Sequence, residues 1–318
     1  MSLPLVSIII NNYNYGRYIN QAIDSALDQT YVNTEVIVVD DGSDDDSTDV
    51  IGHYGDRIIP VIKQNGGQAS ALNAGVAVCK GSIICLLDAD DIYVPEKVAE
   101  TVKAFAADEQ IGWFFHRSTP YKSDVLLAGD LSSIFQEVSK RNAAIETRSI
   151  DFRRNLENAE LPNFAPATSN ISLSRNLVDK IFPMPEVRGK SGVAISDLYL
   201  KLLAIGLETG RQTERYLCLF RQHNNIYSGT EAASKTKITT EISIATAFWM
   251  NVRHESFRKM SDKLFSRGLS LSWRYKVKDE DCQMMIQKYL AELTYVRRLK
   301  VRLMTFYYLL KLKFATAK

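Results

Sequence analysis

The chain has 318 residues, of which 46% are hydrophobic and 24% charged, enough for one large domain or a domain with an appendage. Its formal net charge of +2 excludes the global basic field typical of nucleic-acid binding, so no nucleic-acid partner is expected. No stretch reaches the roughly 18 apolar residues of a membrane span, and "MSLPLVSIII" lacks the features of a signal peptide. The 4 cysteines form no CxxC pair and are expected to be reduced, so we expect a cytoplasmic protein.

Apolar, β-branched runs alternate with amphipathic stretches up to about residue 117. Strands are predicted over 5–11, 35–41, 57–63, 82–88 and 111–116, those over 5–11 and 35–41 as buried strands. Pro60 indicates that the strand over 57–63 lies at an edge or has a bulge. Helices are predicted over 16–29, over 68–79 and from Pro95 onward, because proline suits the first helical position. This alternation predicts an α/β fold with an open, mostly parallel sheet and helices on both faces.

The second half of the chain has a weaker pattern. Helical pieces are expected near 130–158 and over 196–206, a strand over 214–223, and mainly helix from about residue 235. We therefore predict an α/β domain over residues 1–230 and a helical extension over 231–318.

The end of the chain is basic and amphipathic. No acidic residue follows Glu292, whereas Lys and Arg alternate there with Leu, Phe and Tyr. Such a tail suits an anionic membrane surface, a contact between two copies of the chain, or a solvated face of the domain. Peripheral association with the inner membrane face and a homodimer are both open expectations.

Polar clusters follow four consecutive predicted strands, over residues 11–14, 40–43, 65–68 and 88–91. In open α/β sheets, ligands bind outside the carboxyl ends of the strands. The sequence therefore predicts one cleft along that edge of the sheet.

The run "LLDADD" places Asp88, Asp90 and Asp91 at the end of an apolar strand. A divalent cation, Mg²⁺ or Mn²⁺, would remove their mutual repulsion and would keep coordination positions free for phosphate oxygens. The alternative is that the three are loop and cap residues before the following helix.

The run "NGGQASALNAG" is rich in glycine and opens a predicted helix, whose N-terminus favours phosphate. Gly67 is the candidate contact there. The run is neither a G-x-G-x-x-G motif nor a P-loop, which disfavours the commonest dinucleotide and ATP sites.

Taken together, these segments resemble the family 2 glycosyltransferases, which have the GT-A fold. The dense matches are "VSIIINNYNYGRYINQAIDSALDQTY", "EVIVVDDGSDDDSTDVI", "QNGGQASALNAG" and "GSIICLLDADDIYVPEKV", over about residues 5–105. Further on, "ISDLYLKLLAIG" is similar to the acceptor-side motif of the family, and "LFRQHNNIYSG" to the loop that often follows. The resemblance implies a metal-dependent, inverting transfer from a nucleotide-diphosphate sugar, with a UDP-sugar favoured, to an acceptor hydroxyl in polysaccharide or glycan assembly.

The resemblance also implies roles on the donor side. Asp88-Ala89-Asp90 matches the DXD motif, in which Asp90 would bind Mn²⁺ or Mg²⁺ and Asp88 the ribose or a metal-bound water. Asp41 and Tyr13 match positions that hold the base, one by accepting its N–H and the other by stacking. Asn11 lies where the family usually has Pro or Thr, a departure that leaves the base preference open.

On the acceptor side, Asp197 matches the catalytic base of inverting members. Ser196 replaces the acid that usually precedes this base, and both residues would equally suit a helix N-terminus. His223 matches a loop position over the diphosphate and is a further candidate metal ligand, although a lone histidine is more often structural.

Two other functions are compatible with parts of the pattern. A nucleotidyltransferase also uses an α/β sheet, acidic residues and a metal, but its glycine-rich basic loop is absent after the first strand. A non-catalytic module that binds nucleotide sugars is favoured by Ser196 and disfavoured by the intact aspartates. The acceptor, carbohydrate or lipid-linked, is not specified by any motif.

Overall fold

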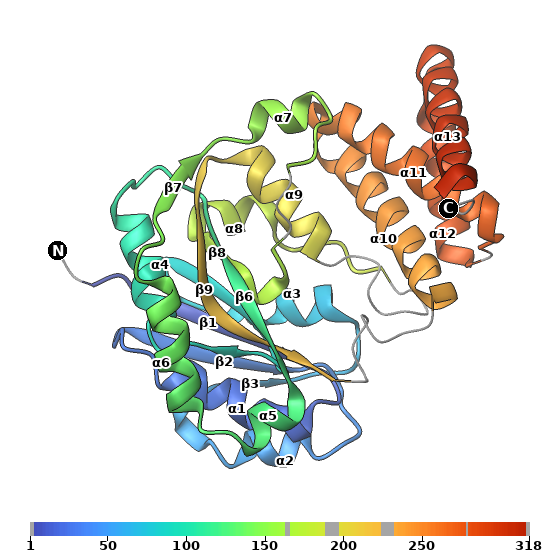
Figure 1. Cartoon of the computed structure of the whole chain (residues 1–318). Coiled ribbons are helices and arrows are strands. Elements are labelled where there is room, and N and C mark those ends of the chain that lie inside the picture. The colour runs from blue at the N-terminus through green and yellow to red at the C-terminus, as the bar shows by residue number, and fades with distance from the viewer. Residues whose placement is uncertain (1–2, 163–165, 188–196, 224–231, 278, 316–318) are drawn as a thin grey trace.

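The computed structural model describes residues 3–162, 166–187, 197–223, 232–277 and 279–315 (Figure 1). Within these ranges nine strands form one mixed sheet, in the order β3-β2-β1-β4-β8-β6-β9-β5, with β7 paired to β9. The strands are β1 (Val6–Asn12), β2 (Thr34–Asp40), β3 (Ile59–Ile62), β4 (Ile83–Asp88), β5 (Ile92–Tyr93), β6 (Trp113–Lys122), β7 (Thr147–Ile150), β8 (Ile171–Ser174) and β9 (Gly210–Gln222).

The first four strands form the parallel half of the sheet. β1 pairs in parallel with both β2 and β4, and β2 pairs in parallel with β3 at the edge. Pro60 lies in β3, where an edge position tolerates the missing N–H. β1, β2 and β4 confirm the prediction from the apolar runs, since a strand covered on both faces needs apolar residues at successive positions. β3 is largely exposed, as an edge strand can be.

The second half of the sheet is not uniformly parallel. β8 pairs antiparallel with β4 and with β6, and β6 then runs parallel to β9. β5 and β7 both pair antiparallel with β9. The prediction of an α/β fold with helices on both faces is confirmed. The sheet is mixed and not mostly parallel, because three short strands that the sequence pattern did not predict, β5, β7 and β8, pair antiparallel with their neighbours.

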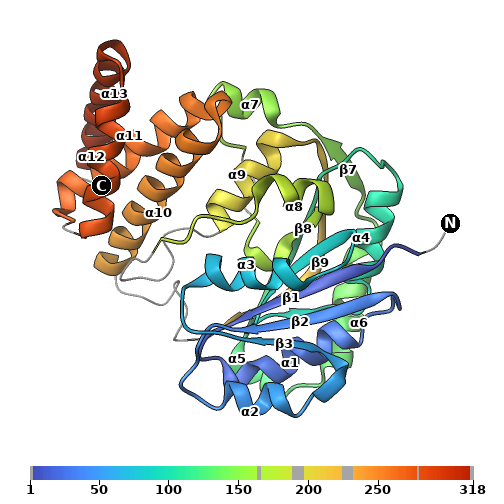
Figure 2. The same cartoon turned by 180° about the vertical axis from the view of Figure 1, so that it is seen from behind.

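Helices cover both faces of the parallel half, with α1 and α2 on one side of β1–β3 and α3 on the other (Figure 1, Figure 2). Alternate strand residues supply two apolar cores, since Ile8 and Val38 belong to one and Ile9 and Val39 to the other.

The helices before the extension are α1 (Gly16–Leu27), α2 (Ser47–Gly52), α3 (Gln68–Val78), α4 (Lys97–Ala106), α5 (Ser123–Ala128), α6 (Leu131–Asn142), α7 (Arg153–Glu157), α8 (Arg175–Ile181) and α9 (Asp197–Leu207). Short 3₁₀ turns cover Gly55–Arg57, Thr168–Asn170 and Glu255–Phe257.

Four helices form the C-terminal extension: α10 (Ala232–Arg253), α11 (Arg258–Tyr275), α12 (Glu280–Glu292) and α13 (Tyr295–Ala315). Their apolar side chains join the same core as α3, α8 and α9. α13 projects beyond the other helices at the end of the molecule farthest from α2 (Figure 1). In the part of the chain that the structure describes, no helix is both long and apolar enough to cross a bilayer.

Candidate active site

Strand register brings the first polar clusters together at the carboxyl edge of the sheet. Asn11 is the register partner of Asp88 on β4, and Asn12 is the partner of Asp40 on β2. The Asn11 side-chain amide donates to Asp88 Oδ1 at 3.1 Å, and the Gln68 amide, from the first residue of α3, donates to the same oxygen at 3.1 Å. Three of the four predicted loops therefore meet around Asp88.

The three carboxylates of "LLDADD" have different partners. Asp91 accepts the backbone N–H of Arg221 at 3.1 Å and the hydroxyl of Ser169 at 2.7 Å, so it ties β4 to β9 and to the Thr168–Asn170 turn. Asp90 Oδ2 lies 3.0 Å from Nε2 of His223, which follows β9. Asp91 therefore joins distant segments of the fold, whereas the oxygens of Asp88 and Asp90 accept from or contact polar side chains at the carboxyl edge of the sheet.

Burial and mutual repulsion both disfavour the charged forms of the clustered aspartates and so raise their pKa values. Burial raises the pKa of Asp88 to about 7, the Asp90 charge adds to this, the Asn11 hydrogen bond opposes it, and the Asp197 charge raises it further. Burial likewise raises the pKa of Asp91, followed by the charges of Asp90 and Asp88. The effect of Asp197 on Asp88 indicates that α9 presents its first carboxylate toward the same region.

The donor set at this cluster fits a hard divalent cation. Carboxylate oxygens of Asp88 and Asp90 are ligands that both Mn²⁺ and Mg²⁺ accept, whereas the imidazole of His223 suits Mn²⁺ better than the oxygen-preferring Mg²⁺. A cation would offset the repulsion that raises the pKa of Asp88. Within the described ranges, no group of three or more His, Cys, Asp or Glu side chains is arranged to hold a metal. The residues therefore fit a cation that takes most of its ligands from elsewhere, as Mg²⁺ does from water and phosphate.

Asp41 is buried in the loop after β2 and organises the glycine-rich turn. Its oxygens accept from Lys63 Nζ at 2.6 Å, from the Gly67 N–H at 2.7 Å and from the Gly66 N–H at 3.0 Å. Gly67 has φ +86° and is the N-cap of α3, a conformation that L side chains rarely adopt. The N–H of Gly67 is thus already used by Asp41, and the turn is built around that carboxylate.

The other predicted base contact, Tyr13, differs in exposure from Asp40, the carboxylate that precedes Asp41. Tyr13 is 48% exposed in the loop after β1, next to Asn14 with φ +59°. Asp40, by contrast, is fully buried and accepts from the Asn12 amide at 2.7 Å and the Ser43 hydroxyl at 2.6 Å. Asp40 is therefore used in shaping the loop, while Tyr13 has a face open to solvent.

Asp197 is the first residue of α9, where a carboxylate is favoured by the helix dipole. Its side chain is 33% exposed, and its Oδ2 lies 3.5 Å from Lys201 Nζ, one turn along the helix. Ser196, which precedes it, lies outside the described residues.

Three contributors to this site are not among the residues to which the sequence assigned a role. Arg221 is fully buried in β9, its Nε donates to the carbonyl of Asp90 at 2.7 Å, and its guanidinium lies 4.6 Å from the centre of the Tyr18 ring. Ser169 and Gln68 hold Asp91 and Asp88 as described above. An arginine inside the apolar run "YLCLFRQ" was the available hint, because a buried charge requires partners.

A mixed α/β sheet with an acidic cluster and a glycine-rich turn at its carboxyl edge defines the class of α/β enzymes that bind nucleotides. Residues 7–180 match the model of the family described as glycosyl transferase family 2. Over 245 residues, 75% of this chain and 72% of the relative, the sequence is 30% identical to an uncharacterized glycosyltransferase of Nostoc sp.. The chain belongs to the family 2 glycosyltransferases.

Other similarities cover smaller parts or show the fold alone. The chondroitin synthase of Pasteurella multocida is 45% identical over 112 residues, which are 34% of this chain and 12% of that protein. Residues 1–349 of S. aureus TarS, in complex with UDP-GlcNAc, superpose with a TM-score of 0.55 at 15% identity, over 93% of this chain and 79% of that one. The mannosyltransferase PcManGT of Pyrobaculum calidifontis, with GDP-Man and Mn²⁺, gives 0.51 at 15% identity, over 98% and 86%. These neighbours confirm the predicted GT-A fold.

Proposed function

We propose that this glycosyltransferase is metal-dependent and inverting, and that it moves a sugar from a nucleotide-diphosphate donor, a UDP-sugar by preference, to an acceptor hydroxyl in polysaccharide or glycan assembly. The observation that carries the proposal is the meeting of Asp88, Asp90 and His223 at one edge of the sheet, with the Asp197 charge acting on Asp88. The UDP-GlcNAc complex of TarS and the chondroitin synthase similarity support the donor class and the polymer context.

Asp88 and Asp90 would supply carboxylate oxygens to Mn²⁺ or Mg²⁺, with His223 a further candidate ligand, and the remaining ligands would come from the diphosphate and water. The bound cation would supply positive charge to the diphosphate as it leaves. The Mn²⁺ in the PcManGT complex supports this assignment, as does the repulsion that raises the Asp88 pKa. Asn11 and Gln68 orient the Asp88 carboxylate by donating to its Oδ1.

Asp197 would take the proton of the attacking acceptor hydroxyl. In this proposal Asp197 and the acceptor lie on the face of the sugar opposite the diphosphate. The acceptor hydroxyl would therefore attack from that face, and the configuration of the anomeric carbon would be inverted. Lys201, 3.5 Å from the carboxylate, helps to orient it.

The donor base would lie against the loops after β1 and β2. Tyr13 offers an exposed ring for stacking. Asp41 is proposed to accept a base N–H, for which it would have to give up one of the loop contacts that now occupy its oxygens, such as that of Lys63. Asn11 and Gly67 complete this side of the proposed donor site. The acceptor would be carbohydrate or lipid-linked, and the enzyme cytoplasmic, peripheral at the inner membrane face.

The test is the variant Asp197→Asn, which keeps the shape of the side chain and removes its basicity. We expect sugar transfer to fall on the order of 10²- to 10⁴-fold, while donor binding, measured by calorimetry, stays within twofold. Glu280→Gln, a change of an acidic first-turn residue in α12, is the matched control and should keep full activity.

Turnover of Asp197→Asn at the wild-type rate would refute the base assignment. Donor binding with no product from the wild-type enzyme and a panel of sugar acceptors would favour the non-catalytic alternative. The nucleotidyltransferase alternative is set aside by the family match.

A further inference from the structure

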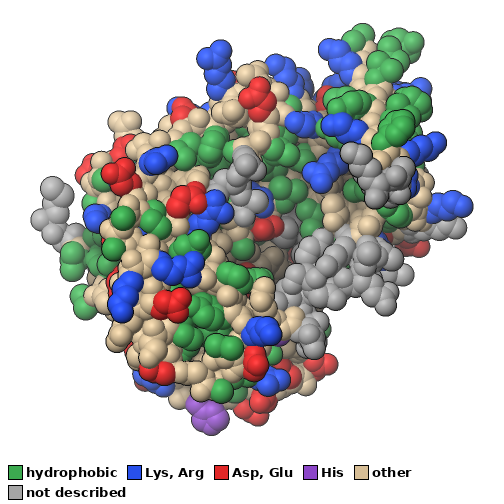
Figure 3. Space-filling view, in the orientation of Figure 1, with side chains coloured by type: hydrophobic (Ala, Val, Ile, Leu, Met, Phe, Trp, Pro, Cys, Tyr) green, Lys and Arg blue, Asp and Glu red, His purple; other side chains and the backbone are tan. Residues whose placement is uncertain are grey.

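α13 carries an exposed apolar stripe along one side. Its members follow one another at intervals of three or four residues and are between 39% and 73% exposed: Val296, Leu299, Leu303, Phe306, Leu310 and Phe314. At 3.6 residues per turn, this spacing places all six on one face of the helix. Figure 3 shows hydrophobic and basic side chains gathered on this projecting helix.

The opposite face of α13 is firmly packed. Val301 and Thr305 are fully buried, and the Val301 carbonyl accepts from the Ser266 hydroxyl of α11 at 3.3 Å. Arg297 Nε donates to both carboxylate oxygens of Asp262, at 2.8 and 3.0 Å. The helix is therefore held in one orientation, and the stripe faces outward because the other side is occupied.

Basic side chains border the stripe on both sides. With 100° of rotation per residue, Lys300 and Lys311 fall along one border, and Arg302 and Lys313 along the other. All four are exposed. Since no acidic residue follows Glu292, the whole exposed side of α13 is apolar in the middle and positive at its borders.

This charge pattern distinguishes between two binding partners of an apolar stripe, a second copy of the helix and a lipid surface. In a pair of identical helices, parallel or antiparallel, basic borders would face basic borders, and like charges there oppose association. An anionic lipid surface accepts the apolar side chains below its headgroups and pairs the basic ones with phosphates. We propose that α13 docks the enzyme in the plane of an anionic membrane through this stripe.

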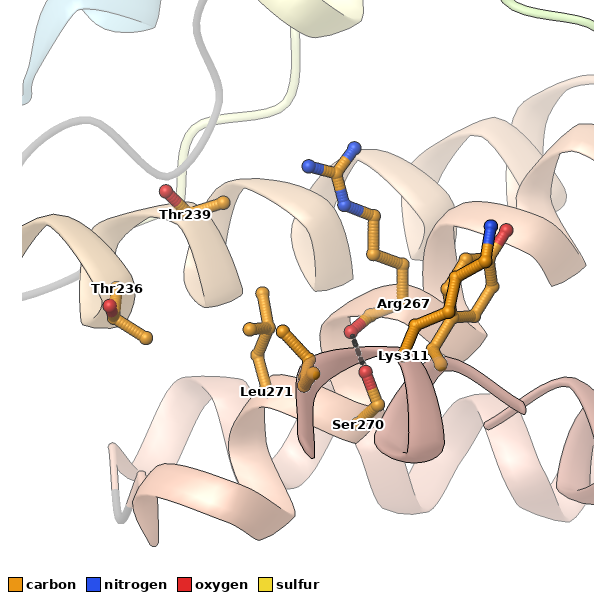
Figure 4. Close-up of a pocket in the computed structure, with 8 residues that line it drawn as sticks. Thr236, Thr239, Arg267, Ser270, Leu271 and Lys311 are labelled. Atoms are coloured by element: carbon orange, nitrogen blue, oxygen red, sulfur yellow. Dashed lines mark hydrogen bonds between the residues drawn. The ribbon is translucent and has the colours of Figure 1, made fainter. Parts of the chain in front are cut away.

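A pocket beside α13 adds phosphate-binding chemistry at the same place. It has a volume of about 330 Å³ and lies between α10, α11 and α13. Arg267 and Lys311 bring cationic groups to it, and Thr236, Thr239 and Ser270 bring hydroxyls (Figure 4). Lys311 belongs both to this pocket and to the border of the stripe, so a lipid phosphate bound here would lie next to the buried acyl region.

The test is co-sedimentation of the full chain with phosphatidylcholine vesicles, with and without phosphatidylglycerol. We expect binding to the mixed vesicles only, weakening as salt is added. The double variant Leu303→Glu with Phe306→Glu should lose at least tenfold in the partition coefficient. Each of Lys300→Gln, Arg302→Gln and Lys311→Gln should lose about fivefold, which corresponds to about 1 kcal/mol per charge.

Val32→Glu is the matched control, because Val32 is an apolar residue, 82% exposed, before β2. It should bind vesicles like the wild type, and so should Asp197→Asn, which separates this inference from the transferase proposal. Wild-type binding by the double variant, or no preference for the anionic vesicles, would overturn the proposal. The proposal would also be overturned if analytical ultracentrifugation showed a dimer for the wild type and a monomer for the double variant, while both bound vesicles equally.

Discussion

At the scale of single residues, three neighbouring aspartates differ because their partners differ. Asp91 is tied by the Arg221 backbone and Ser169, Asp88 by two side-chain amides, and Asp90 by one imidazole. Composition alone treats the three as equivalent. Their hydrogen bonds separate a carboxylate that joins distant segments of the fold from the two to which the proposed cation site is assigned.

Asp90→Ala should abolish metal-dependent donor binding, because it removes the carboxylate nearest His223 and leaves too few hard ligands. The measurement is a thermal-shift series with UDP, GDP, dTDP and CDP, each with Mn²⁺ and with EDTA. Asp44→Ala, at an exposed acidic position, is the control and should keep the wild-type shift. Equal shifts for Asp90→Ala and wild type would reject the metal role.

The raised pKa of Asp88 predicts a pH dependence of stability in metal-free protein. Its pKa rises from 3.8 to about 7 on folding, by burial and then by the Asp90 charge, so the folded state holds a proton that the unfolded state releases. The contribution of Asp88 to the free energy of unfolding is therefore fully present below pH 3.8 and is lost as the pH rises through about 7.

Thermal unfolding measured across this pH window should show a decreasing melting temperature for the wild type and a shallower slope for Asp88→Asn. Part of the slope should remain in the variant, because burial also raises the pKa of Asp91. Mn²⁺ should restore stability at the high end of the window by replacing the proton with a cation. Identical slopes for the two proteins would contradict this account.

At the scale of elements, the carboxyl edge of the sheet depends on how closely α3 packs on β1. A Cβ added at Gly75 would lie 2.5 Å from Ile9 Cγ2 and 3.2 Å from Val39 Cγ2, inside a fully buried core. Both neighbours are β-branched and cannot turn aside within their rotamers. Glycine at this position therefore sets the distance between α3, which carries Gln68, and the strands that carry Asn11 and Asp88.

Gly75→Ala should destabilise the fold, although alanine is the better helix former. The gain in helix propensity is about 1 kcal/mol, whereas overpacking costs about 1–3 kcal/mol, so we expect a net loss on the order of 1 kcal/mol in urea unfolding. Gly52→Ala is the control, since a Cβ there meets nothing within 4 Å and should be neutral or stabilising. A more stable Gly75→Ala would show that the helix can move away at little cost.

At the scale of the whole molecule, the helical extension and the sheet share one continuous apolar core. Side chains of α9, which begins at Asp197, pack in the same cluster as those of α10, α11 and α12. The largely buried pair Arg297–Asp262 then joins α13 to α11, with the Tyr289 hydroxyl donating to Asp262 at 2.8 Å. The position of the projecting helix thus depends on one ion pair and the core beneath it.

Arg297→Ala should loosen α13, because it leaves the Asp262 carboxylate in a largely buried place without its cation. We expect a loss of about 3 kcal/mol in unfolding free energy and faster hydrogen exchange along α13. Arg153→Ala breaks an ion pair in which both side chains are about half exposed, 47% and 48%, and should cost less than about 1 kcal/mol. Unchanged exchange along α13 in Arg297→Ala would show that apolar packing alone holds the helix.

The sequence by itself determined the parallel half of the sheet, its helices and the polar edge. The reason is local: apolar runs, helical spacing and short connections act over a few residues, and parallel strands necessarily bring their carboxyl ends to one edge. Asn11, Asp88 and Gln68 could be expected together on that basis, before their hydrogen bonds were known.

Only the tertiary structure decided the contacts between distant segments. Arg221 lies 130 residues from Asp91, and Ser169 lies 81 residues from Asp88, so no local pattern links them. The short strands β5 and β8 form because neighbouring strands supply their hydrogen bonds, not because of their own composition. The outward direction of the α13 stripe was decided in the same way, since the amphipathic sequence has apolar residues on two faces and packing against α11 buries only one of them.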